Sequence, residues 1–144
     1  MKIHEYQAKA LFRAYGLPVL KGEVAANSTE AVAKATAVSA QGPWVLKAQV
    51  HAGGRGKGGG IQVSRTLDDV RKNAEKILSR PLITPQTGRE GTTVRKLLIE
   101  EGCEIDRELY CAAVLDRARA SVALMASSEG GVEIESRFQS QPHL

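Results

Sequence analysis

The sequence is poor in cysteine and in aromatic residues, and it has no long apolar run. Its 144 residues include two cysteines, and aromatic side chains make up 4%. Two cysteines are too few for a disulfide scaffold, and neither has a His or Cys partner at metal-binding spacing. No window approaches the roughly 18 apolar residues of a membrane span, and the first residues lack the apolar core of a secretory signal. We therefore expect a cytoplasmic protein that crosses no membrane.

The composition is otherwise that of a folded globular chain. Hydrophobic residues make up 42% and charged residues 25%, which argues against a disordered tail or a collagen-like repeat. The length suits one domain or two small lobes. The formal net charge of +4 is spread along the chain, so charge alone indicates neither a nucleic acid nor a membrane surface as a partner.

Three amphipathic helices are expected from the 3–4 spacing of apolar residues. The first starts near the N-terminus and stops at 16–18, the second is capped by Asn27, and the third is capped by Thr66. Glu30 and Asp69 each stand three residues after the cap, where an acidic side chain supports the start of a helix. The apolar faces of the three helices are formed by Ala8, Leu11, Phe12 and Tyr15, by Ala31, Val32, Ala35 and Val38, and by Leu67, Val70, Ala74, Ile77 and Leu78.

Strands are expected where apolar residues cluster between turn signals. These segments are 19–24, 44–50, 61–63, 97–100, 109–115 and 121–126, with a further short one at 82–84. In the second segment, alternation puts Val45, Lys47 and Gln49 on one face of the strand. Because helices and strands are interspersed and some strands follow one another directly, the order predicts an α+β fold with mixed or antiparallel sheets.

The most informative segment is a glycine-rich loop between two expected strands. Six of the eight residues at 53–60 are glycine, and the other two are Arg55 and Lys57. A backbone without Cβ atoms can turn successive N–H groups toward an anion, and the two cations can neutralise phosphate charge. Lys47 lies on the strand that leads into the loop. These features favour a phosphate-binding loop over a merely flexible hairpin tip.

Two well-known phosphate motifs do not fit this loop. A Walker loop around Lys57 would need glycine where His51 stands and a hydroxyl residue where Gly58 stands. The spacing of Gly54, Gly56 and Gly59 matches the dinucleotide fingerprint, but that fingerprint must open a helix, whereas a strand is expected at 61–63. The pattern instead favours a flap between two strands that folds over nucleotide phosphates.

Four blocks of the sequence resemble the beta-subunit family of succinyl-CoA synthetase (succinate–CoA ligase). They occur in the same order as in that family and extend over nearly the whole chain, which makes the resemblance specific. The blocks are MKIHEYQAK at 1–9, GPWVLK at 42–47, QVHAGGRGK at 49–57 and ASSEGGVEIE at 126–135.

The resemblance implies an ATP-grasp fold, of which this chain is expected to be the N-terminal part. Residues from about 23 to 102 would form the complete small lobe, while residues 1–22 and 103–144 would belong to the other lobe. The family's C-terminal CoA-ligase domain is not among these residues. We therefore expect a chain cut from a longer protein and inactive alone.

The resemblance also implies roles for particular residues in nucleotide binding. Lys47 would contact phosphate, and a loop made of Gly54, Arg55 and Gly56 would cover the phosphates. Glu100 would lie at the hinge near the adenine base, where the backbone of Cys103 would contact the base, and Glu108 would bind the ribose hydroxyls.

No catalytic or metal-binding residue is expected in this chain. The family's phosphorylated histidine lies on the alpha subunit, so His4, His51 and His143 are not candidates for the nucleophile. The family's Mg²⁺ ligands, an Asn and an Asp, would lie beyond residue 144. The implied substrates are succinate, CoA and ATP or GTP with Mg²⁺, the implied partner is the alpha subunit, and the implied reaction runs through an acyl phosphate and a phosphohistidine.

Two other functions are kept as alternatives. The close one is the beta subunit of a malate–CoA ligase, because specificity for the acid is determined largely outside this chain. The distant one is a non-catalytic, nucleic-acid-binding module with a basic glycine loop, although a single Arg-Gly unit and few aromatic residues offer little surface for stacking bases.

Overall fold

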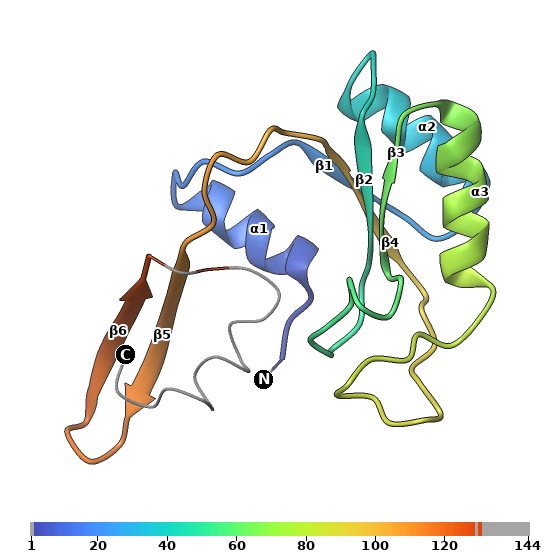
Figure 1. The fold of residues 1–144 in the computed structure, drawn as a ribbon. Coiled ribbons are helices and arrows are strands. Elements are labelled where there is room, and N and C mark those ends of the chain that lie inside the picture. The colour runs from blue at the N-terminus through green and yellow to red at the C-terminus, as the bar shows by residue number, and fades with distance from the viewer. Residues whose placement is uncertain (1, 129, 131–144) are drawn as a thin grey trace. The chain divides into compact units, whose positions relative to one another are not determined.

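The computed structural model describes residues 2–128 and Gly130. Contacts within the chain divide it into two compact units, Met1–Cys103 and Glu104–Leu144. Among the described residues, the first unit contains three helices and a sheet, and the second contains a hairpin (Figure 1). By its contacts, the N-terminal helix belongs to the first unit. The assignment of residues 1–22 and 103–144 to a second lobe of a larger fold stays a prediction.

The first unit is built on a four-stranded sheet with three helices. The strands are β1 (Gly22–Ala25), β2 (Trp44–Ala48), β3 (Ile61–Ser64) and β4 (Leu97–Glu101), and the helices are α1 (Glu5–Ala14), α2 (Ser28–Val38) and α3 (Leu67–Leu78). The strand order is β1-β4-β2-β3, and every pair is antiparallel. The prediction of an α+β fold with antiparallel pairing is confirmed for this unit.

Helices α2 and α3 cover one face of this sheet and bury its apolar side chains (Figure 1). From the strands, Leu46, Leu97 and Ile99 are fully buried against the small, apolar inner faces of the two helices. Removing side chains of this size from water stabilises the fold by about 1.5–3 kcal/mol each. The helix residues in this core are Ala31, Ala35, Val38, Val70, Ala74 and Ile77, as the spacing predicted.

The predicted helix caps are both present. The side chain of Asn27 accepts a hydrogen bond from the backbone N–H of Glu30 at 2.9 Å. At α3, the hydroxyl of Thr66 accepts from the N–H of Asp69 at 3.1 Å, while the Asp69 carboxylate accepts from the N–H of Thr66 at 3.0 Å. Each bond satisfies a donor that the first helical turn would otherwise leave unpaired.

The second unit contains one antiparallel hairpin, formed by β5 (Tyr110–Asp116) and β6 (Ser121–Ser127). It begins and ends within one residue of the strands expected at 109–115 and 121–126. Asp116 closes its turn by accepting hydrogen bonds from the N–H groups of Ala118 and Arg119. Across the portion of the chain that the structure describes, no helix is long and apolar enough to span a membrane.

Candidate nucleotide-phosphate site

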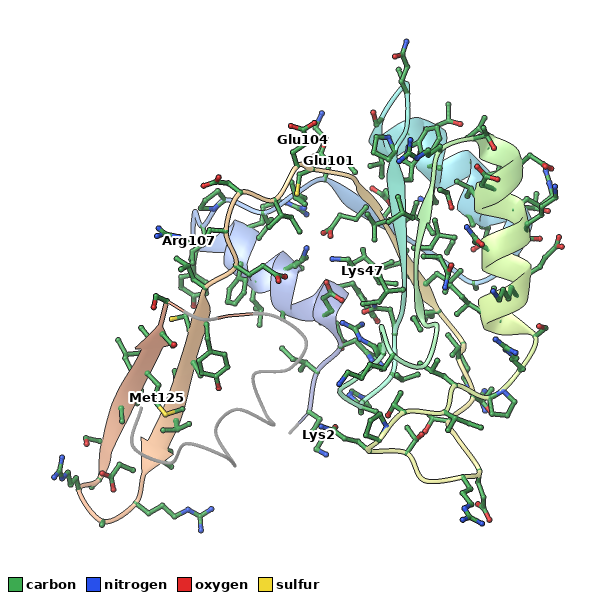
Figure 2. All side chains as sticks on the ribbon, in the orientation of Figure 1. Lys2, Lys47, Glu101, Glu104, Arg107 and Met125 are labelled. Carbon is green, nitrogen blue, oxygen red and sulfur yellow. The ribbon has the colours of Figure 1, made fainter. Side chains whose placement is uncertain are left out.

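The face of the sheet opposite α2 and α3 carries charged side chains. In β2, Trp44, Leu46 and Ala48 are buried, whereas the alternate residues Val45 and Lys47 are half-buried and point to the other face. Val45 pairs with Glu100 in β4, so that Lys47 and Glu100 share this second face. Helix α1 lies on the same side of the sheet as Lys47 (Figure 2).

Five charged residues meet on this face, and we call them the charged cluster: Glu5, Lys9, Lys47, Arg55 and Glu100. The Nζ atom of Lys47 lies 2.6 Å from Oε2 of Glu100 and 3.1 Å from Oε1 of Glu5. The Nη2 atom of Arg55 lies 2.7 Å from the second oxygen of Glu5. Lys9 pairs with the second oxygen of Glu100. One carboxylate of α1 therefore joins the lysine of β2 to the arginine of the glycine loop.

The ion pairs of the charged cluster favour the charged forms of Glu5 and Lys47. Burial alone would raise the pKa of Glu5, but the charge of Lys47 and the hydrogen bond from Arg55 outweigh it and hold that pKa below its ordinary value of 4.5. Burial alone would lower the pKa of Lys47, but the hydrogen bond to Glu100 and the charge of Glu5 raise it above 10.5. Three cations thus face two carboxylates, which leaves an excess of one positive charge in a partly desolvated site.

The glycine loop leaves a short run of backbone donors unused. The N–H groups of Gly58, Gly59 and Gly60 donate to carbonyls of the same loop, and that of Gly53 donates to the side chain of Gln86 at 2.7 Å. The N–H groups of residues 54–56 donate to no other residue that the structure describes. The guanidinium of Arg55 is fixed by a hydrogen bond from Nη1 to the carbonyl of Ala48 at 2.7 Å. These donors are the ones available to an anion.

Several glycines of the loop have a packing role that the sequence did not reveal. A Cβ atom on Gly58 would lie 2.2 Å from the carbonyl oxygen of Ile83, and one on Gly60 would lie 2.7 Å from the side chain of Leu82. Gly54 has a positive φ of 70°, and its Cβ would lie 2.9 Å from Pro85. At Gly56 the nearest atom would be 4.0 Å away. Of these four glycines, Gly56 is thus the one that neither packing nor backbone angle requires.

The structure brings several of the predicted site residues together within the first unit. Lys47, Arg55 and Glu100 belong to the charged cluster. An acid at the end of a strand is most often exposed to solvent, but the side chain of Glu100 is only 1% exposed. Cys103 is an exposed free thiol at the end of the first unit. Glu108 is exposed and lies in the second unit, just before β5. The adenine and ribose contacts of these last two residues stay predictions.

Sequence reasoning missed the contribution of α1 to this site. Glu5 and Lys9 lie 42 and 91 residues from their partners Lys47 and Glu100, a separation that leaves no local pattern. Gln49 adds a further link, since its Oε1 accepts from the N–H of Tyr6 at 3.2 Å. The one available signal was the i, i+4 spacing of Glu5 and Lys9, which puts both charges on one face of the helix.

Comparison with known families and sequences gives consistent matches over nearly the whole chain. Residues 2–144 match the model of the ATP-grasp domain. The chain is 50% identical over 142 residues to the succinate–CoA ligase [ADP-forming] subunit beta of Bacillus velezensis, and 54% identical over 143 residues to that of Bordetella petrii. Each match covers 99% of this chain but only 37% and 36% of the relative, so the chain spans little more than a third of their length.

Solved structures share the fold at lower identity. An acetyl-coenzyme A synthetase of Ca. Korarchaeum cryptofilum superposes with a TM-score of 0.73 at 24% identity, covering 94% of this chain and 57% of that one. A protein from Pyrococcus horikoshii Ot3 superposes with a TM-score of 0.72 at 23% identity, covering 93% of this chain and 55% of that one. At this identity the likeness shows the fold alone.

Proposed function

Because the chain belongs to the ATP-grasp domain family, we propose that it is the nucleotide-binding part of the beta subunit of a succinate–CoA ligase. The complete enzyme would catalyse succinate + CoA + ATP ⇌ succinyl-CoA + ADP + phosphate. The relatives at 50% and 54% identity carry the name of the ADP-forming succinate enzyme, which supports succinate over malate and ATP over GTP. The nucleic-acid alternative gains no support from them.

The observation that carries this proposal is the convergence of Lys47 and Arg55 on one carboxylate. Two cations that hold both oxygens of Glu5 at 3.1 and 2.7 Å are spaced to hold the oxygens of a polyphosphate in the same way. The unused N–H groups of residues 54–56 would add donors beside them. Together these groups would offset the charge that develops when a phosphoryl group is transferred.

The remaining steps of the reaction require groups outside this chain. We propose that an alpha subunit supplies the histidine that receives the phosphoryl group, and that the protein works in the cytoplasm. The described residues contain no group of three or more His, Cys, Asp or Glu side chains that could hold a metal ion. We propose that the ligands of the Mg²⁺ ion that accompanies the nucleotide lie beyond residue 144, so that the role of this chain is to bind and orient the nucleotide.

Nucleotide binding by the chain tests the proposal directly. We expect ATP to bind in an isothermal titration and Lys47→Ala to weaken that binding. Lys34→Ala is the matched control, because it removes a lysine that pairs with Glu23 at 3.1 Å on the surface of the same unit. Binding of single-stranded RNA without binding of ATP would reject the proposal in favour of the nucleic-acid alternative. Equal loss of affinity in both lysine variants would reject the role of Lys47.

A further inference from the structure

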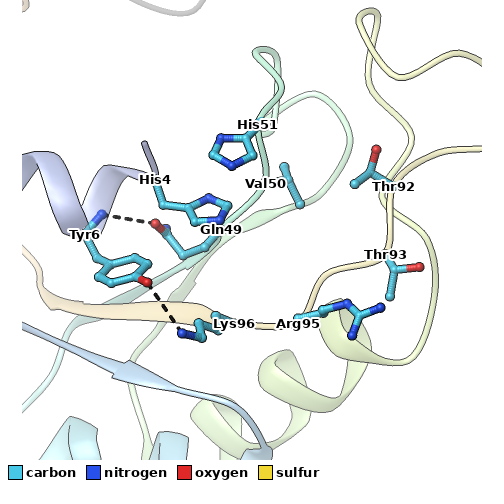
Figure 3. A pocket seen from close by; sticks show the side chains of 9 residues that line it. All are labelled: His4, Tyr6, Gln49, Val50, His51, Thr92, Thr93, Arg95 and Lys96. Atoms are coloured by element: carbon cyan, nitrogen blue, oxygen red, sulfur yellow. Dashed lines mark hydrogen bonds between the residues drawn. The ribbon is translucent and has the colours of Figure 1, made fainter. Parts of the chain in front are cut away.

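A hollow lies close to the charged cluster in the first unit, and none of the side chains that line it is acidic. It encloses about 350 Å³ and lies entirely within the first unit. Its volume falls at the lower end of the range of small-molecule sites. Its lining residues are His4, Tyr6, Gln49, Val50, His51, Thr92, Thr93, Arg95 and Lys96, shown in Figure 3.

Two histidines from distant parts of the chain stack at this hollow. The rings of His4 and His51 have centroids 4.0 Å apart and planes inclined by 11°, and Figure 3 shows them one above the other. The stack brings the segment before α1 and the segment after β2 together at the wall of the hollow.

The charges around His4 are predominantly positive. Burial is the largest cause that lowers the pKa of His4, followed by the charges of His51, Lys96 and Arg55. The nearest carboxylate in sequence, that of Glu5, is already bound by Lys47 and Arg55.

Two further groups face the imidazole of His4 or line the same hollow. Tyr6, on α1, stacks at 5.9 Å, and its hydroxyl lies 3.5 Å from Nζ of Lys96. Arg95 comes from the segment that leads into β4, and it makes no hydrogen bond or ion pair with another described residue. The hollow is therefore a positively charged site without a counter-ion from the described chain.

We propose that this hollow binds a phosphate-class oxyanion, separately from the nucleotide phosphates assigned to Lys47 and Arg55. The planar guanidinium of Arg95 and the ammonium of Lys96 are the groups that proteins use to hold phosphate. The hydroxyls of Thr92 and Thr93 line the same wall and can donate further hydrogen bonds. The ligand is inorganic phosphate or the phosphate group of a larger molecule. The inference rests on the hollow itself and does not depend on nucleotide binding.

Anion binding here should be coupled to protonation of the stacked histidines. A phosphate next to two imidazoles favours their charged form and offsets the repulsion between them. The pKa values of the two histidines can be measured by NMR of their imidazole groups in the 144-residue chain. The chain is titrated between pH 5 and 8, with and without inorganic phosphate, at constant ionic strength. We expect saturating phosphate to raise the pKa of His4 by about half a unit to one unit relative to chloride. Phenyl phosphate serves as the second probe and distinguishes a free ion from an esterified one, since tighter binding of the ester identifies a larger ligand.

Substitutions of residues that line the hollow, and of one residue outside it, test whether phosphate binds there. Arg95→Gln and Lys96→Gln remove exposed side chains that no core packing needs, and each should weaken phosphate binding about 10- to 100-fold, the loss of one charge-assisted hydrogen bond. Arg80→Gln, an exposed arginine outside the hollow, is the matched control and should change nothing. The proposal is overturned if phosphate shifts the His4 pKa no further than chloride does, or if malonate, a dicarboxylate, shifts it equally. It is also overturned if the effect is lost in Lys47→Gln but kept in Lys96→Gln.

Discussion

Replacing Glu5 with glutamine should lower the stability of the fold and raise its affinity for nucleotide. The substitution keeps the shape of the side chain but removes the charge that holds Lys47 at 3.1 Å and Arg55 at 2.7 Å. A hydrogen bond to a charged group contributes about 1.5–3 kcal/mol to the free energy of unfolding. Because the Glu5 side chain is 21% exposed, screening by solvent reduces this contribution. Because Lys47 keeps its bond to Glu100, we expect the free energy of unfolding to fall by about 1–2 kcal/mol at pH 7.

The opposite effect on affinity follows from competition for the same cations. In the present structure a carboxylate occupies the donors of Lys47 and Arg55 that a polyphosphate would use. Removing its charge frees these donors, and a gain of about 0.7–1.4 kcal/mol corresponds to 3- to 10-fold tighter binding of ATP. Urea unfolding measures the first quantity and isothermal titration with ATP the second, on the same protein preparations.

The pH dependence gives a further check on the role of Glu5. Its pKa in the folded chain lies below the ordinary 4.5, so the ionised carboxylate stabilises the fold above that pH. This contribution is lost as the pH falls through the lowered value. The difference in stability between wild type and Glu5→Gln should therefore be full at pH 7 and shrink as the pH falls below the ordinary value of 4.5.

The surface ion pair between Glu23 and Lys34 provides a control for Glu5→Gln, and the change in ATP affinity can refute the prediction. Glu23→Gln breaks the exposed pair with Lys34, whose partners lie 3.1 Å apart, and it should cost less than about 1 kcal/mol. The reasoning fails if Glu5→Gln is as stable as the wild type at pH 7. It fails equally if ATP binds more weakly to this variant, because Glu5 would then position the cations rather than compete for them.

Three further substitutions test other parts of the proposed nucleotide site. Lys47→Ala should weaken ATP binding by about 1.5–3 kcal/mol, as measured by isothermal titration, because it removes a cation from the phosphates; unchanged affinity would refute the assignment. Gly56→Ala should reduce ATP affinity without lowering the melting temperature, whereas Gly58→Ala should lower the melting temperature because its Cβ would lie 2.2 Å from the carbonyl oxygen of Ile83. Early melting of the Gly56 variant with normal affinity would contradict this. In the complete enzyme, Glu108→Ala should raise the KM for nucleotide and leave the KM for succinate unchanged; the reverse pattern would reject its ribose contact.

The features that the sequence predicted well depend on residues close together in the chain. Asn27 and Thr66 cap helices through bonds to residues three positions away, and the alternation in β2 depends on neighbouring residues alone. The hairpin of β5 and β6 turns at Asp116 through bonds to Ala118 and Arg119. Such features are fixed by local geometry, so composition and spacing were enough to find them.

The limits of strands were predicted less well, because they depend on pairing across the sheet. The strand expected at 19–24 occurs as β1 at Gly22–Ala25, where its residues meet Leu97–Glu100 of β4. The strand expected at 44–50 ends at Ala48, since its pairing with β4 ends at Leu97. The short strand expected at 82–84 is a single bridge between Leu82 and Thr92. The partners of β1 and β2 in β4 lie tens of residues away in the chain, so they leave no signal in a short window.

Helix α1 shows how this difference between local and distant determinants bears on function. The helix was predicted from its apolar spacing, yet it buries no residue, and Leu11, Phe12 and Tyr15 are 51%, 49% and 82% exposed. Its contacts with the sheet are made by its charged face instead, through Glu5 and Lys9. A helix attached mainly by ion pairs is held by forces that a bound anion can offset, unlike α2 and α3, which are held by buried apolar area. The same cations that would bind a polyphosphate thus also hold α1, so nucleotide binding and the attachment of this helix are expected to be coupled.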